Sequence, residues 1–202
     1  MDAPICAENR RDVAAALGNA MRHKGLGSYR AAADLFTIAA AGGSAVAQYQ
    51  LGRLYRRGDG VRADQVLAAH WWERSAAQGY AKALVGLGVM YKIGAGVAVD
   101  LIRAAALFSA AAEKNHAVAH YHLGDMHARG AGVVLNARQA FAHFQRAAEQ
   151  GYSPAQYFLG LFYLDGVGVA RDARCGVQWL KCAADQGCAL AALHLKGFAP
   201  QI

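Results

Sequence analysis

The sequence predicts an all-α solenoid of stacked helix pairs, and two observations support that fold class. The 202-residue chain repeats with a 36-residue period, in which four Leu-Gly pairs recur and each is followed six residues later by Gly-x-Gly-Val. Self-similarity at this length is typical of supersecondary units that bury their apolar faces only against neighbouring units. Within each period, apolar residues also follow helical spacing on both sides of the Gly-x-Gly turn. The glycines of the Leu-Gly pairs are Gly52, Gly88, Gly124 and Gly160.

The first half of each repeat is predicted to be an amphipathic helix. In residues 47–57 the apolar side chains recur at i, i+4, i+7 and i+8, which places them on one helical face. The Gly-Asp-Gly turn that follows ends this helix at Gly58, because glycine tolerates the left-handed backbone conformation found at helix C-termini. The apolar residues concerned are Ala47, Leu51, Leu54 and Tyr55.

The second half is predicted to be another helix, over about residues 65–78. Asp64 suits the N-cap position, where a carboxylate accepts hydrogen bonds from the first backbone amides, and Gly79 ends the helix. Small residues in the columns of Gly52 and Ala76 let neighbouring helices approach closely. The residues expected to face inward are Ala68, Trp71, Trp72, Ser75 and Ala76.

The same register continues into both flanks as incomplete repeats. One period upstream, Ser28 falls at a cap position and Gly43 at a helix end, after a first helix over residues 9–24. Downstream, Ala191 begins a further first helix that includes Phe198 and is expected to end at Ile202. We therefore predict a single domain, 1–202, with a degenerate N-terminal capping repeat over 9–44, four repeats over 45–80, 81–116, 117–152 and 153–188, and a C-terminal half-repeat cap over 189–202.

The repeat resembles a known family. Its pattern, Ala-x-x-x-Leu-Gly-x-x-Tyr-x-x-Gly-x-Gly-Val-x-x-Asp followed by Ala-x-x-Trp-Trp-x-x-x-Ala-x-x-Gly, is similar to the Sel1-like repeat, a relative of the tetratricopeptide repeat. The resemblance covers residues 45–188. It implies a right-handed superhelix of antiparallel helix pairs that acts as a protein-interaction scaffold, in bacteria often within signalling, envelope, secretion or host-interaction systems. A cysteine-rich subgroup associated with β-lactam binding carries regularly repeated cysteine pairs that this chain lacks, so that activity is not expected.

Charge and hydropathy exclude some classes of partner. The chain carries 21 Lys and Arg against 14 Asp and Glu, and these basic residues are scattered rather than clustered. We therefore expect no nucleic-acid partner. No apolar stretch reaches the length of a transmembrane helix, so membrane insertion is not expected either.

The N-terminus and the cysteines indicate the compartment. The first residues lack a basic start followed by an apolar run, so they do not read as a signal peptide. The four cysteines do not follow the period, and we expect each to be a reduced, small, buried side chain. These features predict a cytoplasmic protein, or a periplasmic one if an export signal has been removed. The cysteines are Cys6, Cys175, Cys182 and Cys188.

The first helices carry the candidate partner-binding surface. By the resemblance they line a concave groove, and positions i, i+4, i+7 and i+11 of each form one face. This face is basic in the first full repeat and apolar in the fourth, which favours a polypeptide with acidic residues at one end and apolar anchors at the other. The candidate residues are Gln50, Arg53, Arg56, Arg57, Val89, Ile93, His122, Asp125, Arg129, Phe158, Leu161 and Leu164.

Structural alternatives remain open for several of these residues. Phe158, Leu161 and Leu164 can instead pack under the C-terminal half-repeat or the tail, and the arginines can form a solvated face. Gly86, next to Val89 on the same face, can form a shallow floor that a partner backbone approaches.

A second class of function is a metal-binding, small-molecule-binding or enzymatic repeat protein. His116, His120 and His127 fall on one side of a helix, and histidines at i and i+4 can share a metal ion. They occupy packing columns, however, so we expect neither a metal nor a cofactor. The Gly-x-Gly loops join two helices and lack the Lys-Ser or Lys-Thr of a phosphate loop. No serine lies in a nucleophile elbow, so we predict a protein without catalytic activity.

Overall fold

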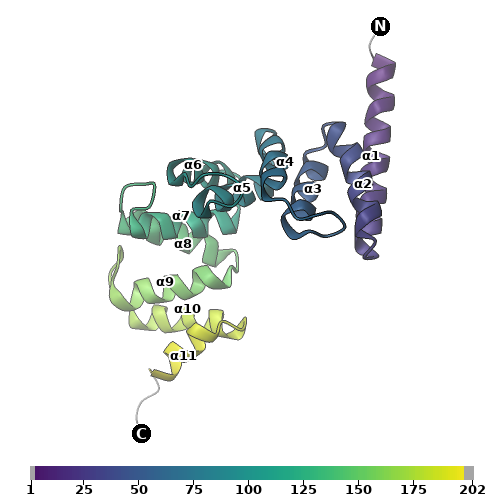
Figure 1. Ribbon diagram of the computed structural model, residues 1–202. Coiled ribbons are helices and arrows are strands. Elements are labelled where there is room, and N and C mark those ends of the chain that lie inside the picture. The colour runs from purple at the N-terminus through teal and green to yellow at the C-terminus, as the bar shows by residue number, and fades with distance from the viewer. Residues whose placement is uncertain (1–2, 198–202) are drawn as a thin grey trace. The chain divides into compact units, whose positions relative to one another are not determined.

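The computed structural model describes the backbone of residues 3–197 and the side chains of residues 11–197. The described residues form eleven α-helices and no strand, which confirms the all-α prediction (Figure 1). They group into an N-terminal unit, residues 1–100, and a C-terminal unit, residues 101–202. Phe198 and Ile202, predicted in the last helix, and the Cys6 side chain lie outside the described parts. None of the described helices is both long and apolar enough to span a bilayer.

The N-terminal unit contains five helices, each of which packs on its neighbours in the chain. Phe36 is fully buried at its centre, among small and branched side chains that include Ala20, Leu51 and Leu54. The first helix begins at Ala3, earlier than predicted, because Pro4 is tolerated within a first helical turn. The helices are α1 (Ala3–Gly25), α2 (Tyr29–Ala41), α3 (Ala45–Arg57), α4 (Gln65–Ala77) and α5 (Ala81–Ile93).

The C-terminal unit contains the remaining six described helices, again packed on their neighbours in the chain. Phe144 is buried beside Phe162 and Leu159, and Leu180 lies in a second cluster near the C-terminus. Alanine columns fill the space between these larger side chains, as the repeat pattern predicts. The helices are α6 (Leu101–Ala112), α7 (Ala117–Arg129), α8 (Ala137–Glu149), α9 (Ser153–Asp165), α10 (Ala173–Asp185) and α11 (Ala189–Gly197).

The Gly-x-Gly turns join the two helices of a repeat and also contact the preceding repeat. The first glycine ends the helix in the left-handed conformation, as at Gly58 with φ 77°. The second glycine lies directly on the start of an earlier helix, so that a Cβ at Gly132 would overlap the backbone of Leu101. The same overlap occurs between Gly60 and Tyr29, Gly96 and Gln65, and Gly168 and Ala137.

Side-chain caps begin three of the second helices. Asp64 accepts a hydrogen bond from the Leu67 amide at 2.9 Å, which confirms its predicted role as an N-cap. Asn136 and Asp172 accept equivalent bonds at 3.0 and 2.9 Å. Ser28 occupies the N-cap position of α2, but its side chain makes no capping bond.

Candidate functional site

In the N-terminal unit, the face of the first helices carries a cluster of cations around one buried amide. Gln50 is only 7% exposed, and its Oε1 accepts hydrogen bonds from Lys24 Nζ at 2.9 Å and from Arg53 Nη1 at 3.4 Å. These side chains come from α1 and α3, and Lys82 of α5 and Arg57 lie close enough to act on Lys24. We call this set, Lys24, Gln50, Arg53, Arg57 and Lys82, the basic patch.

The electrostatics of the basic patch are dominated by like charges. Partial burial lowers the pKa of Lys24, and the nearby Arg53, Arg57 and Lys82 lower it further. Asp59 opposes this effect, but its carboxylate lies 3.0 Å from Arg57 Nε and is therefore already engaged. The patch thus presents more positive than negative charge.

Aromatic side chains lie beneath two arginines of this surface. Arg53 lies 5.9 Å from the centre of the Tyr49 ring, and Arg56 lies 5.7 Å from that of Trp72. The two rings stack with centroids 6.0 Å apart, and Trp72 Nε1 donates a hydrogen bond to the Tyr49 carbonyl at 3.0 Å. These contacts orient both arginines on the surface of α3.

Further along α5, at Val89 and Ile93, the same face is apolar. Ile93 is 65% exposed and Val89 is half-buried, so both are accessible, as predicted. Gly86 is half-buried, and a Cβ there would come within 2.8 Å of the Trp72 indole. Trp72 therefore packs against one side of Gly86, and the shallow floor for a partner backbone stays a prediction.

In the C-terminal unit, the polar residues of the equivalent face on α7 engage one another or the core. Arg129 forms an ion pair with Asp125 one turn earlier in α7. His122 stacks on Phe108 with ring centroids 4.6 Å apart. This part of the surface therefore combines the half-buried His122 and Asp125 with the exposed Arg129, whose charge Asp125 compensates.

Two of the predicted surface residues turn out to be largely buried. Leu164 is 7% exposed because it packs on α10, where Gly176 leaves space: a Cβ there would lie 2.7 Å from Leu164 Cγ. Gln50 is buried beneath the two cations that it binds. Neither side chain offers a free contact surface, so these two predictions are corrected.

Phe158 and Leu161 are half-buried on α9. The Phe158 ring stacks on Phe144 at 5.3 Å and also contacts Tyr121 and Tyr157. Leu161 packs at the edge of the cluster that includes Leu180 and Ala191. The structural alternative therefore holds in part for both residues, although each keeps some exposed surface.

The histidines pair differently from the predicted set. His120 Nδ1 lies 3.1 Å from His143 Nδ1, and the His127 ring stacks on His143 with centroids 5.7 Å apart. Burial, with the nearby His120 and His127, lowers the pKa of His143 to about 4, and burial lowers the pKa of His120 as well. Among the described residues, no group of three or more His, Cys, Asp or Glu side chains is arranged to hold a metal ion.

The described cysteines do not match the predicted buried positions. Cys182 is exposed, and Cys175 and Cys188 are half-buried; all three are free thiols. Cys175 and Cys182 lie on α10, and Cys188, just before α11, packs at the edge of the Leu180 cluster. A hydrogen bond with Asp172 raises the pKa of the Cys175 thiol, which disfavours a reactive thiolate there.

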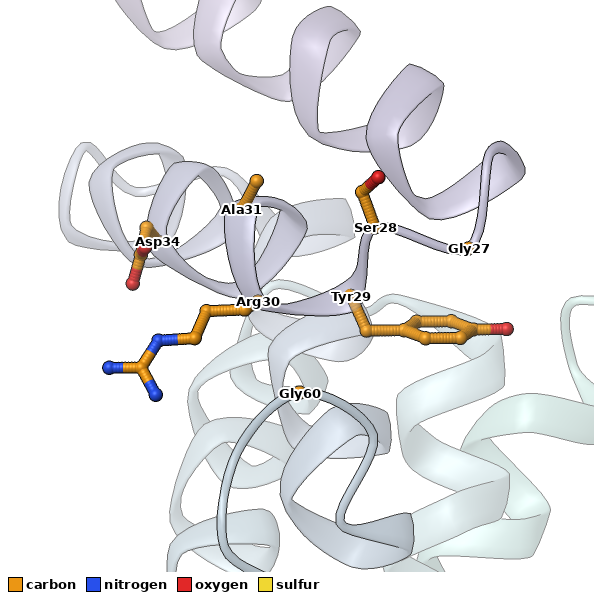
Figure 2. Close-up of a pocket in the computed structure, with 7 residues that line it drawn as sticks. All are labelled: Gly27, Ser28, Tyr29, Arg30, Ala31, Asp34 and Gly60. Atoms are coloured by element: carbon orange, nitrogen blue, oxygen red, sulfur yellow. The ribbon is translucent and has the colours of Figure 1, made fainter.

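An open depression lies beside the start of α2 (Figure 2). Gly60 sits under the backbone of Tyr29 and Arg30, whose side chains point to opposite sides. Because the same glycine contact recurs in later repeats, we interpret this depression as a feature of repeat packing rather than a ligand pocket.

Comparison with known proteins places this architecture in a family. The Sel1 repeat model matches residues 45–80, 81–116, 117–152 and 153–188. A Sel1 repeat protein from Oxalobacter formigenes is 32% identical, with a TM-score of 0.84 over 89% of this chain and 72% of that one. A Sel1 repeat protein from Klebsiella pneumoniae, 20% identical with a TM-score of 0.59 over 96% of this chain and 95% of that one, shares the fold.

A longer relative is also similar. A protective antigen of uropathogenic Escherichia coli that displays an SLR fold is 28% identical, with a TM-score of 0.85. The match covers 93% of this chain but 42% of the antigen, so this chain spans less than half of that relative's length. No curated protein matches the chain. The four matched repeats, together with these structures, show that the chain belongs to the Sel1 repeat family.

Proposed function

We propose that this chain is a non-catalytic scaffold that binds a protein or peptide on the exposed face of its first helices. Sel1 repeats generally mediate protein–protein interactions, and their fold is typically a non-catalytic scaffold. These relatives come from bacteria, and we propose that the partner belongs to a bacterial signalling, secretion or envelope-related system.

One observation carries the proposal: within each unit, the leucines of the Leu-Gly pairs are buried, whereas several varying positions on another face of the first helices are accessible. Leu51 and Leu123, from the repeating Leu-Gly pairs, are 1% and 3% exposed. On the face of the first helices away from these leucines, Arg57, Ile93 and Asp165 occupy equivalent positions, are exposed and differ in chemistry. Stacked helices hold such side chains in fixed positions, which lowers the ordering cost when a partner binds.

The proposed contact residues follow from this division. In the N-terminal unit they are Arg53, Arg56, Arg57, Val89 and Ile93, with Gln50 acting as a support for Arg53 rather than as a contact. In the C-terminal unit they are His122, Asp125, Arg129, Phe158 and Leu161, with Leu164 supporting them from the core.

An affinity pull-down from the native lysate tests the proposal. The bait is the full chain, compared with the variant Arg53→Glu/Arg57→Glu. A matched control, Arg62→Glu/Arg138→Glu, makes the same change in net charge at exposed positions away from this face. Circular dichroism verifies that all three proteins fold.

We expect a protein that the wild type and the control retain and the first-helix variant loses by about tenfold or more, since each reversed charge repels an acidic partner. Equal retention by all three baits, or equal loss in both variants, contradicts the proposed surface.

A further inference from the structure

The basic patch of the N-terminal unit has an unusual arrangement of donors. Lys24 and Arg53, from two different helices, both donate to the single amide oxygen of Gln50, at 2.9 and 3.4 Å. A neutral oxygen satisfies their hydrogen-bonding geometry but does not compensate their charge. Bonds from Lys or Arg to a carboxylate are roughly twice as strong as bonds between neutral groups.

The surroundings of this pair add positive charge. Arg57 and Lys82 also act on Lys24, and Asp59 is the carboxylate that opposes them. Because Asp59 is engaged by Arg57, an arriving carboxylate would meet Lys24, Arg53 and Lys82 without a competing anion from Asp59. The partial burial of Lys24 strengthens that attraction, since screening by water is weaker there.

We propose that the basic patch binds an acidic segment of the partner polypeptide, with carboxylates placed against Lys24, Arg53 and Lys82. This inference rests on the proposed function and specifies the chemistry of its partner. It assigns roles to Lys24 and Lys82 in addition to the arginines of α3.

The neighbouring aromatic side chains favour an acidic peptide over a nucleic acid. Binding of single-stranded nucleic acid relies on open aromatic faces on which bases stack. Here the Tyr49 ring is packed between Trp72 and Tyr80, and Arg53 lies over it. Trp72 is itself only 4% exposed. The patch therefore offers charge without a stacking platform.

Gln50 provides a specific test, because Gln50→Glu changes the neutral acceptor into a carboxylate of the same shape. The new carboxylate would occupy the hydrogen-bonding positions of Lys24 and Arg53 from within the chain. It should therefore raise or preserve the melting temperature and compete with an external acidic segment.

The experiment measures binding of a fluorescein-labelled octaglutamate peptide to the full-length protein by fluorescence anisotropy, at an ionic strength of about 0.05 M where screening is weak. The proteins are the wild type, Gln50→Glu, Lys24→Gln, Arg53→Gln and the control Arg62→Gln. Octaglutamine and oligothymidylate serve as comparison ligands.

We expect binding of octaglutamate but not octaglutamine. Gln50→Glu, Lys24→Gln and Arg53→Gln should each weaken it about tenfold, and Arg62→Gln should change it less than about twofold. If Arg62→Gln weakens octaglutamate binding as much as these variants do, the effect reflects only the net charge of the protein, and the proposal is overturned. Tighter binding of oligothymidylate than of octaglutamate, or no octaglutamate binding, would overturn it as well.

The outcome separates this inference from the proposed function. If octaglutamate fails to bind while the pull-down still retains a partner through the first-helix face, the scaffold function stands and the acidic-segment inference falls. If octaglutamate binds as expected but the pull-down variants behave alike, binding of acidic segments by the basic patch stands and the proposed first-helix contact surface falls.

Discussion

At the residue scale, the second glycine of each Gly-x-Gly turn explains much of the period. Its left-handed backbone suits glycine, but that alone would allow other residues at some cost. The stricter requirement is steric. Gly132 has no room for a Cβ, because the backbone of Leu101 lies against it. Both the left-handed backbone conformation and the lack of space for a Cβ therefore favour glycine at this position.

Substitution of Gly132 separates these two requirements. Gly132→Ala should lower the free energy of unfolding by about 3 kcal/mol or more, because the left-handed conformation costs about 1–2 kcal/mol and the overlap adds to it. Gly151 has a similar φ of 82°, but a Cβ there would have no neighbouring atom within 4 Å, so Gly151→Ala should show the conformational cost alone. Urea unfolding of the two variants measures the difference, and equal losses would contradict the contact.

Individual residues also explain why the candidate site could be predicted only in part from the sequence. Helical spacing fixes Arg53 and Arg57 on one face, and both lie there in the structure. Leu164 is buried because Gly176 stands where the other repeats have alanine, as at Ala140, and this difference acts through the neighbouring helix. Lys24 lies upstream of the four full repeats, so no repeating column identifies it. Its sequence signal is a basic last turn of α1.

At the element scale, pairs of helices are joined by side chains that vary between repeats. Gln48 donates to the Ala40 carbonyl at 3.1 Å and accepts from Gln78 at 2.8 Å. Gln156 makes the same two kinds of bond, to Ala148 and from Gln186, at 3.3 and 2.7 Å. The third repeat replaces this glutamine by His120, which is paired with His143 of α8 instead. Sequence columns alone do not reveal such partners, because the contacts cross between helices.

We expect the histidine pair to make the stability of the C-terminal unit depend on pH. The fold lowers the pKa of His143 to about 4, with Arg146 adding to the effects of burial, His120 and His127. Above about pH 6.5 the ring is neutral in both folded and unfolded chains, so it contributes no pH dependence. As the pH falls from about 6.5 towards 4, the unfolded chain binds a proton that the fold excludes, and stability decreases.

His143→Leu should remove the His143 contribution and leave that of His120, and the second repeat shows that leucine fits here, with Leu107 at the same position. We expect the wild type to lose about 1–2 kcal/mol more than the variant between about pH 7.5 and pH 5, after allowance for the half-exposed ring. Urea unfolding at the two pH values measures this, with His70→Leu, at an exposed position of α4, as the control. An equal loss in the wild type and His143→Leu would show that the pair does not carry the effect.

At the scale of the whole molecule, the 36-residue period predicts the fold because each repeat buries equivalent residues against its neighbours. The predicted all-α fold, the Gly58 helix end and the Asp64 cap are all present. The proposed partner surface is harder to predict, because it consists of residues that do not repeat. Our central claim is that these varying residues of the first helices, rather than the second helices, contact the partner.

Site-specific photo-crosslinking tests that claim most directly. A photoreactive amino acid at Ile93 on α5 is compared with the same residue at Val66 on α4. These apolar side chains are 65% and 64% exposed, so accessibility is matched. In the native lysate, we predict a crosslinked partner from position 93 and none from position 66. A partner crosslinked from position 66 and not from 93 would contradict the account.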